Sequence, residues 1–394
     1  MKRRGFLGMV AGSGVASAAE AGAAANVDRL ARTAATIMAP RADGVEVVWA
    51  VNGSCLGRIE WTGPEGIKGS AAADAFGMTP QGNEVLRVRI DGWKPGSEYR
   101  LRAVTESADR KRAEESEWKD FRTLDPAADS TSFVVWNDTH ENHETLKALH
   151  EGSPGGDFMI WNGDTCNDWH KEEWLVPTLL DPAGQDFTAG RPLMLVWGNH
   201  DVRGRWAYRV PEFVATPANK PYYAFRSGPV AAVCLHTGED KPDAHPSFGG
   251  RVAFERLREE QAAWLEEVTA SPGFREAPYR VVFCHIPLRW TTERVIERSA
   301  YGNGSYDYYS KFSRDLWHDA LVKWGAQVVV SGHTHQVAWM PGNDDFPYAQ
   351  LTGGGPQPDR ATWIEGKADG KSLSLVVKGL NGEELQNASF KPLR

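Results

Sequence analysis

Cysteine is scarce in this sequence of 394 residues, which contains only four of them. Their spacing is not that of a disulfide framework. Cys234 and Cys284 lie in apolar runs typical of buried strands and are interpreted as small core residues. Cys166 lies two residues after Asp164, and we expect it to line a pocket.

The chain also lacks an excess of positive charge, because its formal net charge is −8. That balance excludes a basic patch of the kind that binds nucleic acid or an anionic membrane surface. No Gly-rich phosphate loop, Ser/His/Asp arrangement or internal repeat is apparent. With 41% apolar and 24% charged residues, the composition is that of an ordinary soluble protein, and the length suffices for two domains with cores of their own.

Long apolar runs are missing as well. The stretch from Gly8 to Ala16 is too short and too rich in glycine to span a bilayer, so we expect no transmembrane segment. It follows Lys2-Arg-Arg-Gly-Phe-Leu7, which resembles a twin-arginine export signal and precedes small-residue cleavage sites. We interpret residues 1–25 as this signal and predict export to the periplasm or the extracellular space.

Residues 40–125 contain only strand-like runs and no residues with catalytic spacing. The turn that leads from Asp91 to Tyr99 resembles the tyrosine corner of fibronectin type III sandwiches, in which a tyrosine hydroxyl bonds back to the backbone. We therefore predict a small all-β, fibronectin-like sandwich with a structural role. The polar turn at 125–130 is the natural boundary to the next domain.

The second predicted domain covers residues 131–385. Apolar runs rich in β-branched and aromatic residues indicate strands buried on both faces, and helical patterns occur at 144–150, 171–180, 254–269 and 316–324. This mixture predicts an α/β or α+β fold in which two sheets stack face to face with helices outside.

Five polar blocks each end or follow one of the buried strands. Because α/β sheets place their sites at the carboxyl ends of strands, we expect the blocks to gather at one sheet edge. The blocks are Asp138-Thr-His140, Gly163-Asp164, Gly198-Asn-His-Asp201, His285 and Gly332-His-Thr-His335.

The residue types in these blocks suit two adjacent metal ions. Carboxylates and imidazoles are ligands for iron, zinc or manganese, and two ions bridged by a carboxylate and a hydroxide lie about 3.5–4 Å apart, a separation that favours in-line phosphoryl displacement. Asp138 and His140 fall on one turn and can serve the same ion, whereas Asp164 is suited to bridge. Asn199 offers a neutral oxygen to the second ion. These oxygen and imidazole ligands suffice, so Cys166 is not expected to bind a metal.

The ordered series of blocks resembles the calcineurin-like metallophosphoesterase superfamily over residues 132–380. The resemblance implies a four-layer β-sandwich flanked by helices, two metal ions, and hydrolysis of a small-molecule phosphate ester by a hydroxide that bridges the metals. It also implies two ligand sets that share one aspartate. The first set is Asp138, His140, Asp164 and His335, and the second is Asp164, Asn199, His285 and His333.

By the same resemblance His200 is not a ligand. It would stabilise phosphoryl charge or protonate the leaving oxygen, with Asp201 orienting its ring; the alternative is a loop histidine that supports the fold. Asn167, Arg203 and His236 are the predicted substrate contacts. Asn167 is equally suited to a polar turn at a helix entry, and Arg203 to an ion pair with an acid.

The two-domain layout is similar to that of purple acid phosphatases, with two departures. Those enzymes have a tyrosine ligand where this chain has Asn167, and they lack the histidine that this chain keeps as His140. We therefore expect a non-purple relative, without assigning ferric iron to the first site. The layout favours a phosphomonoesterase. A phosphodiesterase shares all five blocks, and a non-catalytic, metal-bearing binding protein is the alternative from another class.

Tryptophan is frequent near the blocks. Trp136, Trp161 and Trp197 end three successive strands and are expected to pack beneath the site. Loops past the blocks carry three more that we predict to form a hydrophobic rim for an organic leaving group, namely Trp169, Trp206 and Trp290.

Overall fold

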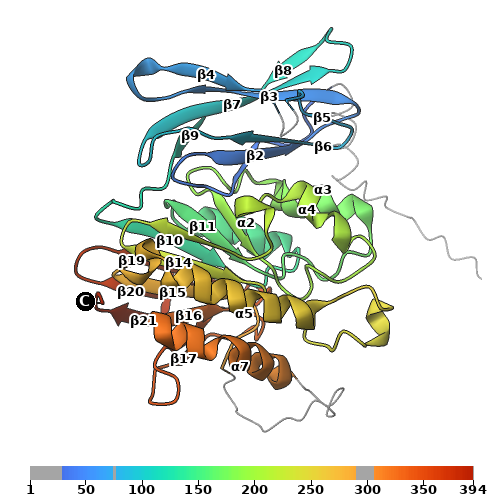
Figure 1. The fold of residues 1–394 in the computed structure, drawn as a ribbon. Coiled ribbons are helices and arrows are strands. Elements are labelled where there is room, and N and C mark those ends of the chain that lie inside the picture. The colour runs from blue at the N-terminus through green and yellow to red at the C-terminus, as the bar shows by residue number, and fades with distance from the viewer. Residues whose placement is uncertain (1–28, 74–76, 290–305, 394) are drawn as a thin grey trace, which may run out of the picture.

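A nine-stranded sheet runs through the centre of the molecule (Figure 1). The computed structural model describes residues 29–73, 77–289 and 306–393, so the predicted export signal at residues 1–25 lies outside the described residues. The order is β21 (Glu384–Phe390), β20 (Leu373–Gly379), β19 (Thr362–Ala368), β10 (Thr131–Trp136), β11 (Phe158–Asn162), β12 (Leu193–Val196), β1 (Thr36–Met38), β2 (Val45–Ala50) and β6 (Val85–Ile90). Strands β10, β11, β12 and β1 pair in parallel, and antiparallel strands extend the sheet at both ends.

A six-stranded sheet stacks on one face of this central sheet. Residues alternate between the two sides of each strand: Phe133 and Val135 of β10 pack against the second sheet, whereas Val134 and Trp136 face away from it. The second sheet has the order β13 (Tyr223–Ser227), β14 (Val230–Leu235), β15 (Tyr279–Cys284), β16 (Val328–Ser331), β18 (Ala349–Thr352) and β17 (Ala338–Met340).

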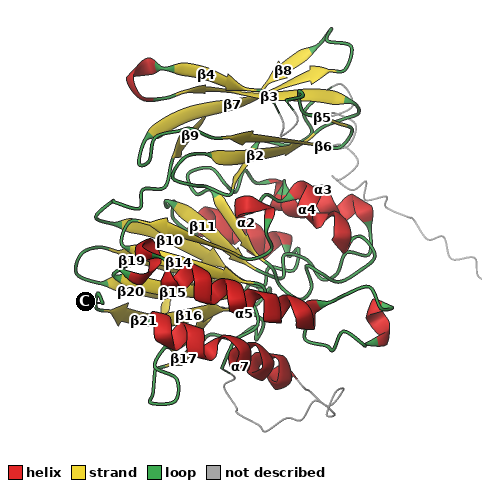
Figure 2. Cartoon of the chain, in the orientation of Figure 1, coloured by secondary structure: helices red, strands yellow, loops and turns green. Residues whose placement is uncertain are grey.

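Helices cover the two outer faces of the stacked sheets (Figure 2). Leu146 and Leu149 of α2 share a core with the central sheet, and Leu265 of α5 and Trp317 of α7 share one with the second sheet. The helices are α2 (His143–Gly152), α3 (Leu175–Leu179), α4 (Val210–Phe213), α5 (Phe254–Ala270), α6 (Pro272–Arg275) and α7 (Tyr306–Trp324). The predicted four-layer sandwich flanked by helices is confirmed. Within the described residues no helix is both long and apolar enough to cross a membrane.

The N-terminal strands form a further two-layer unit above the central sheet (Figure 1). Along β2, Val47 and Trp49 point into this unit, while Val48 and Ala50 point into the core of the central sheet. The predicted backbone bond of the tyrosine corner is present, since the Lys94 amide donates to the Tyr99 hydroxyl at 2.9 Å. The outer strands are β3 (Cys55–Thr62), β4 (Lys68–Ala71), β5 (Gln81–Gly82), β7 (Glu98–Ser107), β8 (Ala113–Glu115) and β9 (Lys119–Arg122).

Strands β1, β2 and β6 thus join this N-terminal unit to the central sheet as one continuous sheet. The division into domains at 40–125 and 131–385, and the likeness to fibronectin type III, stay predictions.

The five polar blocks do not lie at the edge of one sheet, and this expectation was wrong. Three blocks follow β10, β11 and β12 of the central sheet, and two follow β15 and β16 of the second sheet. The blocks still converge, because the carboxyl ends of both parallel sets open on the same side of the stacked sheets. The site is therefore assembled across two sheets.

Candidate metal centre

The loops that carry the predicted ligands have an unusual backbone. Residues other than glycine rarely adopt a positive φ, and such strain concentrates at functional sites. Five of the seven predicted ligands adopt it, with φ of 47° at Asp138, 44° at His140, 52° at Asp164, 67° at His333 and 54° at His335. In the Asp138-Thr-His140 block the turn brings both ligand side chains into one donor group.

The glycines of the blocks allow these loops to approach one another closely. A Cβ on Gly163 would collide with the His285 ring, and one on Gly332 would collide with the Asp138 carboxylate. A Cβ on Gly198 would likewise collide with Asp164. Each glycine lies against a ligand from a different block, so the blocks are matched in three dimensions.

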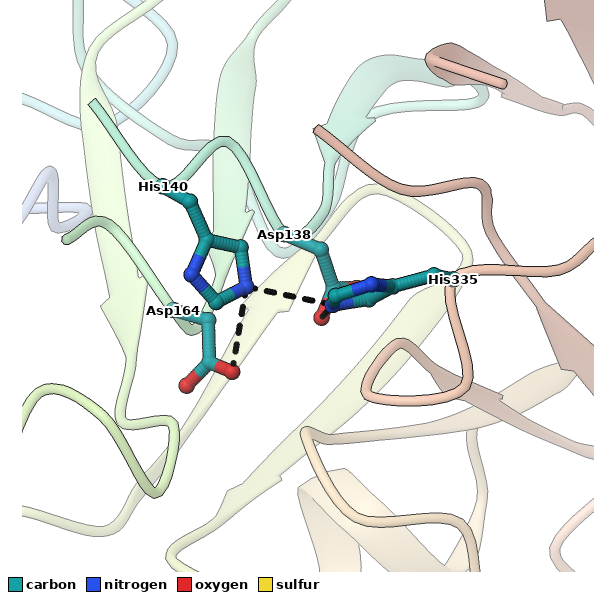
Figure 3. A group of neighbouring side chains, drawn as sticks. All are labelled: Asp138, His140, Asp164 and His335. Carbon is teal, nitrogen blue, oxygen red and sulfur yellow. Dashed lines mark hydrogen bonds and ion pairs between the residues drawn. The ribbon is translucent and has the colours of Figure 1, made fainter. Parts of the chain in front are cut away.

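The first group of donors is Asp138, His140, Asp164 and His335, whose ligand atoms lie within 4.8 Å of one another. Figure 3 shows His140 between Asp164 and the pair Asp138 and His335. The His140 Nε2 atom lies 3.1 Å from His335 Nε2 and 3.5 Å from the Asp164 carboxylate. His335 Nε2 in turn lies 3.5 Å from Asp138 Oδ1.

The second group is Asp164, His285 and His333, again within 4.8 Å. His285 Nε2 lies 3.1 Å from Asp164 Oδ2 and 3.8 Å from Asp138 Oδ1. The amide oxygen of Asn199 is 2.9 Å from His333 Nδ1, so Asn199 adjoins this group. Asp164 belongs to both groups, which brings all seven predicted ligands into one cluster.

Charge is unevenly distributed within the cluster. Burial alone would lower the pKa of His285, but the carboxylates of Asp164 and Asp138 outweigh it and raise this pKa to about 10. Burial and the nearby His285 lower the pKa of His333 to about 4. For the Asp164 carboxyl, burial opposes ionisation, yet His285 holds its pKa well below the usual range.

These residues fit metal ions. The buried Nε2 of His285 faces two carboxylates but makes no hydrogen bond to any described residue. His140 and His335 present ring nitrogens to each other, an arrangement in which only one can donate. A cation between them satisfies both lone pairs, and mixed imidazole and carboxylate donors suit zinc, iron or manganese.

The comparison with known families decides the assignment. A sequence model described as calcineurin-like phosphoesterase matches residues 131–337, more than half of the chain. The chain belongs to the calcineurin-like phosphoesterase family. The matched region contains all the residues of the cluster. It does not include the N-terminal unit.

Individual relatives agree with this assignment. The serine/threonine-protein phosphatase CPPED1 of Homo sapiens is 29% identical over 199 residues, which are 50% of this chain and 58% of the relative. The protein from Bos taurus is 28% identical over 202 residues, with the same coverage. The chain therefore matches little more than half the length of these curated relatives.

Solved structures share the fold over most of the chain. A purple acid phosphatase from yellow lupin (Lupinus luteus) seeds superposes with a TM-score of 0.68 at 13% identity, covering 92% of this chain and 75% of that one. A structure of PhoD superposes with a TM-score of 0.59 at 14% identity, covering 93% and 90%. At such identities the likeness concerns the fold alone.

In this calcineurin-like phosphoesterase His200 lies beside the cluster. Its backbone amide donates to Asp164 Oδ1 at 2.9 Å, and its ring centroid is 5.0 Å from that of His140. Its Nδ1 atom lies 2.8 Å from Asp168 Oδ1. Burial lowers the pKa of His200, but the hydrogen bond to Asp168 and the nearby Asp164 carboxylate together outweigh it, so that the pKa lies above its usual value.

The predicted role of Asp201 needs a correction. Its carboxylate accepts hydrogen bonds from the backbone amides of Asp164, Thr165 and Gly198 and from the Thr165 hydroxyl, all within 2.9 Å. With both oxygens occupied by two donors each, Asp201 fixes the loops that carry Asp164 and Asn199. Asp168 is the residue that orients the His200 ring.

Asn167 contacts the rings of two histidines at the site, His140 and His200. Its Oδ1 atom lies 3.1 Å from His140 Nδ1, and its backbone oxygen contacts the His200 ring. Asn167 positions the His140 ring from the side away from the cluster, and its predicted contact with substrate stays a prediction.

Arg203 pairs with acids, the second of its two sequence alternatives. Its guanidinium forms a two-pronged ion pair with Glu239 and lies 3.2 Å from Asp240, while Nη1 remains 3.4 Å from His200 Nε2. Burial raises the pKa of Glu239 to about 7 despite this pairing. The sequence interpretation did not include Glu239 or Asp240, although two adjacent acids shortly after the buried strand β14 were a signal for them.

One of the remaining predicted residues lines a cavity next to the cluster. His236 lines it, stacked against Trp197 with ring centroids 5.9 Å apart. Trp169 is fully buried and donates to the Asp201 carbonyl, so its predicted place in an exposed rim was wrong. Trp206 is half-buried, and Trp290 lies outside the described residues. Cys166 is fully buried in the core beside the site.

Proposed function

We propose that this chain is an exported phosphomonoesterase that works with two metal ions. The observation that carries the proposal is the sharing of Asp164 by two donor groups, with His200 bonded to the same carboxylate. A purely structural metal site has no need of a histidine held next to its ligands by a separate acid. Export rests on the sequence of residues 1–25 alone.

Each group of donors would hold one ion. Asp138, His140 and His335 would complete the first set, and Asn199, His285 and His333 the second, with Asp164 common to both. When bound, two such ions lower the pKa of a water molecule and neutralise charge on the phosphoryl oxygens.

The protein's own contribution to the chemistry is the proton on His200. Asp168 holds Nδ1 and raises the pKa of the ring, which favours the imidazolium near neutral pH. The imidazolium can then donate from Nε2 to the oxygen of the departing alcohol. Arg203 is held by ion pairs with Glu239 and Asp240 and provides a second positive group next to this ring.

Preference for monoesters is the finer part of the proposal. It is supported by the relatives named as serine/threonine-protein phosphatases, enzymes whose substrates are monoesters, and by the fold shared with a purple acid phosphatase. A phosphodiesterase with the same ligands is the alternative that the experiment must separate.

The test compares p-nitrophenyl phosphate with bis-p-nitrophenyl phosphate on protein reconstituted with Mn, Zn or Fe, with metal content measured by elemental analysis. We expect two ions per chain and a higher kcat/KM for the monoester. The Asp164→Ala variant should lose both ions and at least ~10³-fold in kcat. Faster turnover of the diester would overturn the monoester assignment, and equal rates in wild type and variant would overturn the dinuclear mechanism.

A further inference from the structure

A large cavity adjoins the metal centre. Its volume is about 1230 Å³, larger than the few hundred to ~1000 Å³ typical of small-molecule sites. Asp168 and Arg203 line it, and both lie next to His200. A group that leaves from the metal centre past His200 therefore enters this cavity.

The cavity is cationic although the chain as a whole is acidic. Six arginines and lysines line it against two carboxylates, in a chain of net charge −8. Three of the six are neutralised by acids: Arg87 by Glu46, Arg203 by Glu239 and Arg256 by Glu260.

The other three cations, Arg205, Lys220 and Arg251, have no ion pair within the part of the chain that the structure describes. All three side chains are exposed, so water now solvates them. The Nε atoms of Arg205 and Arg251 donate to backbone carbonyls, which leaves their terminal guanidinium nitrogens available. Guanidinium groups in this state bind phosphate with paired hydrogen bonds.

Aromatic side chains stand among these cations. Tyr208 lines the cavity with 70% of its surface exposed, and it stacks on Trp206 with ring centroids 6.2 Å apart and an interplanar angle of 23°. Arg205 lies over the Trp206 ring, 5.9 Å from its centroid. Trp206 is half-buried behind Tyr208, so the exposed Tyr208 ring is a platform on which another planar ring can stack.

Resting on the phosphoesterase function proposed above, we propose that this cavity binds the leaving group of the substrate, and that this group carries a planar ring and a second phosphate. Tyr208, supported by Trp206 behind it, binds the ring by stacking. Lys220 and Arg251, with Arg205, bind the second phosphate, while the first phosphate occupies the metal centre. A nucleoside bisphosphate has this chemistry.

Three substrates distinguish the contribution of the planar ring from that of the second phosphate. Adenosine 3′,5′-bisphosphate has both, 5′-AMP has only the ring, and 2,3-bisphosphoglycerate has only the second phosphate. We expect kcat/KM for adenosine 3′,5′-bisphosphate to exceed the values for 5′-AMP and for 2,3-bisphosphoglycerate by at least ~10-fold. A single charge-assisted hydrogen bond is enough to produce a difference of this size. Equal values for the bisphosphate and 5′-AMP, or a preference for an acidic phosphopeptide, would overturn the proposal.

Variants locate the effect in the cavity. The Lys220→Gln, Arg251→Gln double variant should lose at least ~10-fold in kcat/KM for the adenosine bisphosphate and less than ~2-fold for p-nitrophenyl phosphate. Tyr208→Ala should weaken both nucleotides by ~5-fold or more and leave the glycerate unchanged. The matched control is Lys371→Gln, an exposed lysine in the turn between β19 and β20. An equal loss on p-nitrophenyl phosphate would show that the cavity is no subsite.

A binding measurement keeps this inference separate from the proposed catalytic function. Calorimetric titration of adenosine 3′,5′-bisphosphate into the full-length protein without added metal does not depend on turnover. Binding by the wild type, with at least ~10-fold weaker binding by the double variant, would support the cavity site. This conclusion would hold even if the protein did not hydrolyse p-nitrophenyl phosphate. Equal binding by both proteins overturns the site, whatever the activity.

Discussion

Two buried histidines have pKa values shifted in opposite directions, and the difference distinguishes the candidate metal centre from the cavity beside it. His285 is fully buried and His236 is 3% exposed. Carboxylates of Asp164 and Asp138 raise the pKa of His285 to about 10, overcoming its burial. Burial lowers the pKa of His236 to about 3, and the nearby Arg258 adds to the effect. Burial alone does not set the charge of a histidine; the carboxylates within reach do.

The two regions differ as a whole in the same way. The centre is acidic and buried. It is built on strained loops that pack closely against one another because the polar blocks contain glycines. The cavity is cationic and lined by exposed side chains on the loops after β12 and β14. This division matches the two proposals above, which place the reaction at the centre and the choice of substrate at the cavity wall.

The largest expected effect comes from His200, which lies at the border between the two regions. His200→Ala should lower kcat for p-nitrophenyl phosphate by ~10²–10⁴-fold, because the proton donor for the leaving oxygen is lost. Metal content, measured by elemental analysis, should stay at the wild-type level because the ring is not a ligand. A drop in both kcat and metal content would place His200 in the centre itself.

Arg203 ties the cavity wall to the centre, and removing its charge should cost stability. Arg203→Met removes the two-pronged partner of the fully buried Glu239 and leaves it with Lys241, whose Nζ atom lies 3.5 Å away. We expect a loss of about 2–3 kcal/mol in the free energy of unfolding. The pKa of Glu239, already about 7, should rise further in the variant. A protonated Glu239 needs no cation, so the loss should be largest above pH 7 and smaller as the pH falls.

Chemical unfolding at pH 6 and pH 9 measures this loss. The Arg203→Met, Glu239→Gln double variant is the control, since it has no buried charge to leave unpaired and should recover part of the stability. A loss that is the same at both pH values would contradict the pairing.

The low pKa of His236, on the cavity side, predicts a loss of stability at acidic pH. Its folded pKa, about 3, lies below the value of about 6.5 expected in the unfolded chain. The unfolded state therefore gains a proton first as the pH falls, and stability is lost below pH 6.5. Between pH 7 and pH 5 the His236 contribution amounts to about 2 kcal/mol.

Urea unfolding at these two pH values tests the effect in wild type and in His236→Phe, which keeps an aromatic ring against Trp197. The variant should lose about 2 kcal/mol less on acidification. His170→Gln, a change at an exposed histidine, should behave as wild type. A variant with the wild-type acid sensitivity would mean that the ring of His236 is charged in the fold.

The smallest effect is expected far from both regions, in the N-terminal unit. Tyr99→Phe removes the hydroxyl that accepts from the Lys94 amide and should cost about 1 kcal/mol of stability. Turnover of p-nitrophenyl phosphate should not change, because Tyr99 packs in the core of the N-terminal unit and is not part of either donor group. A loss of activity greater than ~2-fold would give the unit a role in the site.

Most strands were predictable from the sequence, and the exceptions have physical reasons. The five strands that lead to the blocks are continuous apolar runs buried on both faces. Strand β19 was missed because Glu365, Gly366 and Lys367 interrupt its apolar pattern. Gly366 is there because the Phe133 ring occupies the space where a Cβ would lie. That requirement comes from a strand more than 200 residues away in the chain.

By itself the sequence determined the ligands, because their types, their order and the strands before them are local properties of the chain. Tertiary structure decided how they are used. Two stacked sheets, and not one edge, bring the blocks together, so that Asp164 meets both groups of donors. Tertiary structure also decided that Asp168, and not the adjacent Asp201, orients the His200 ring. Neighbours in sequence point apart when the backbone between them turns, and only the folded chain fixes which side chain fills the space.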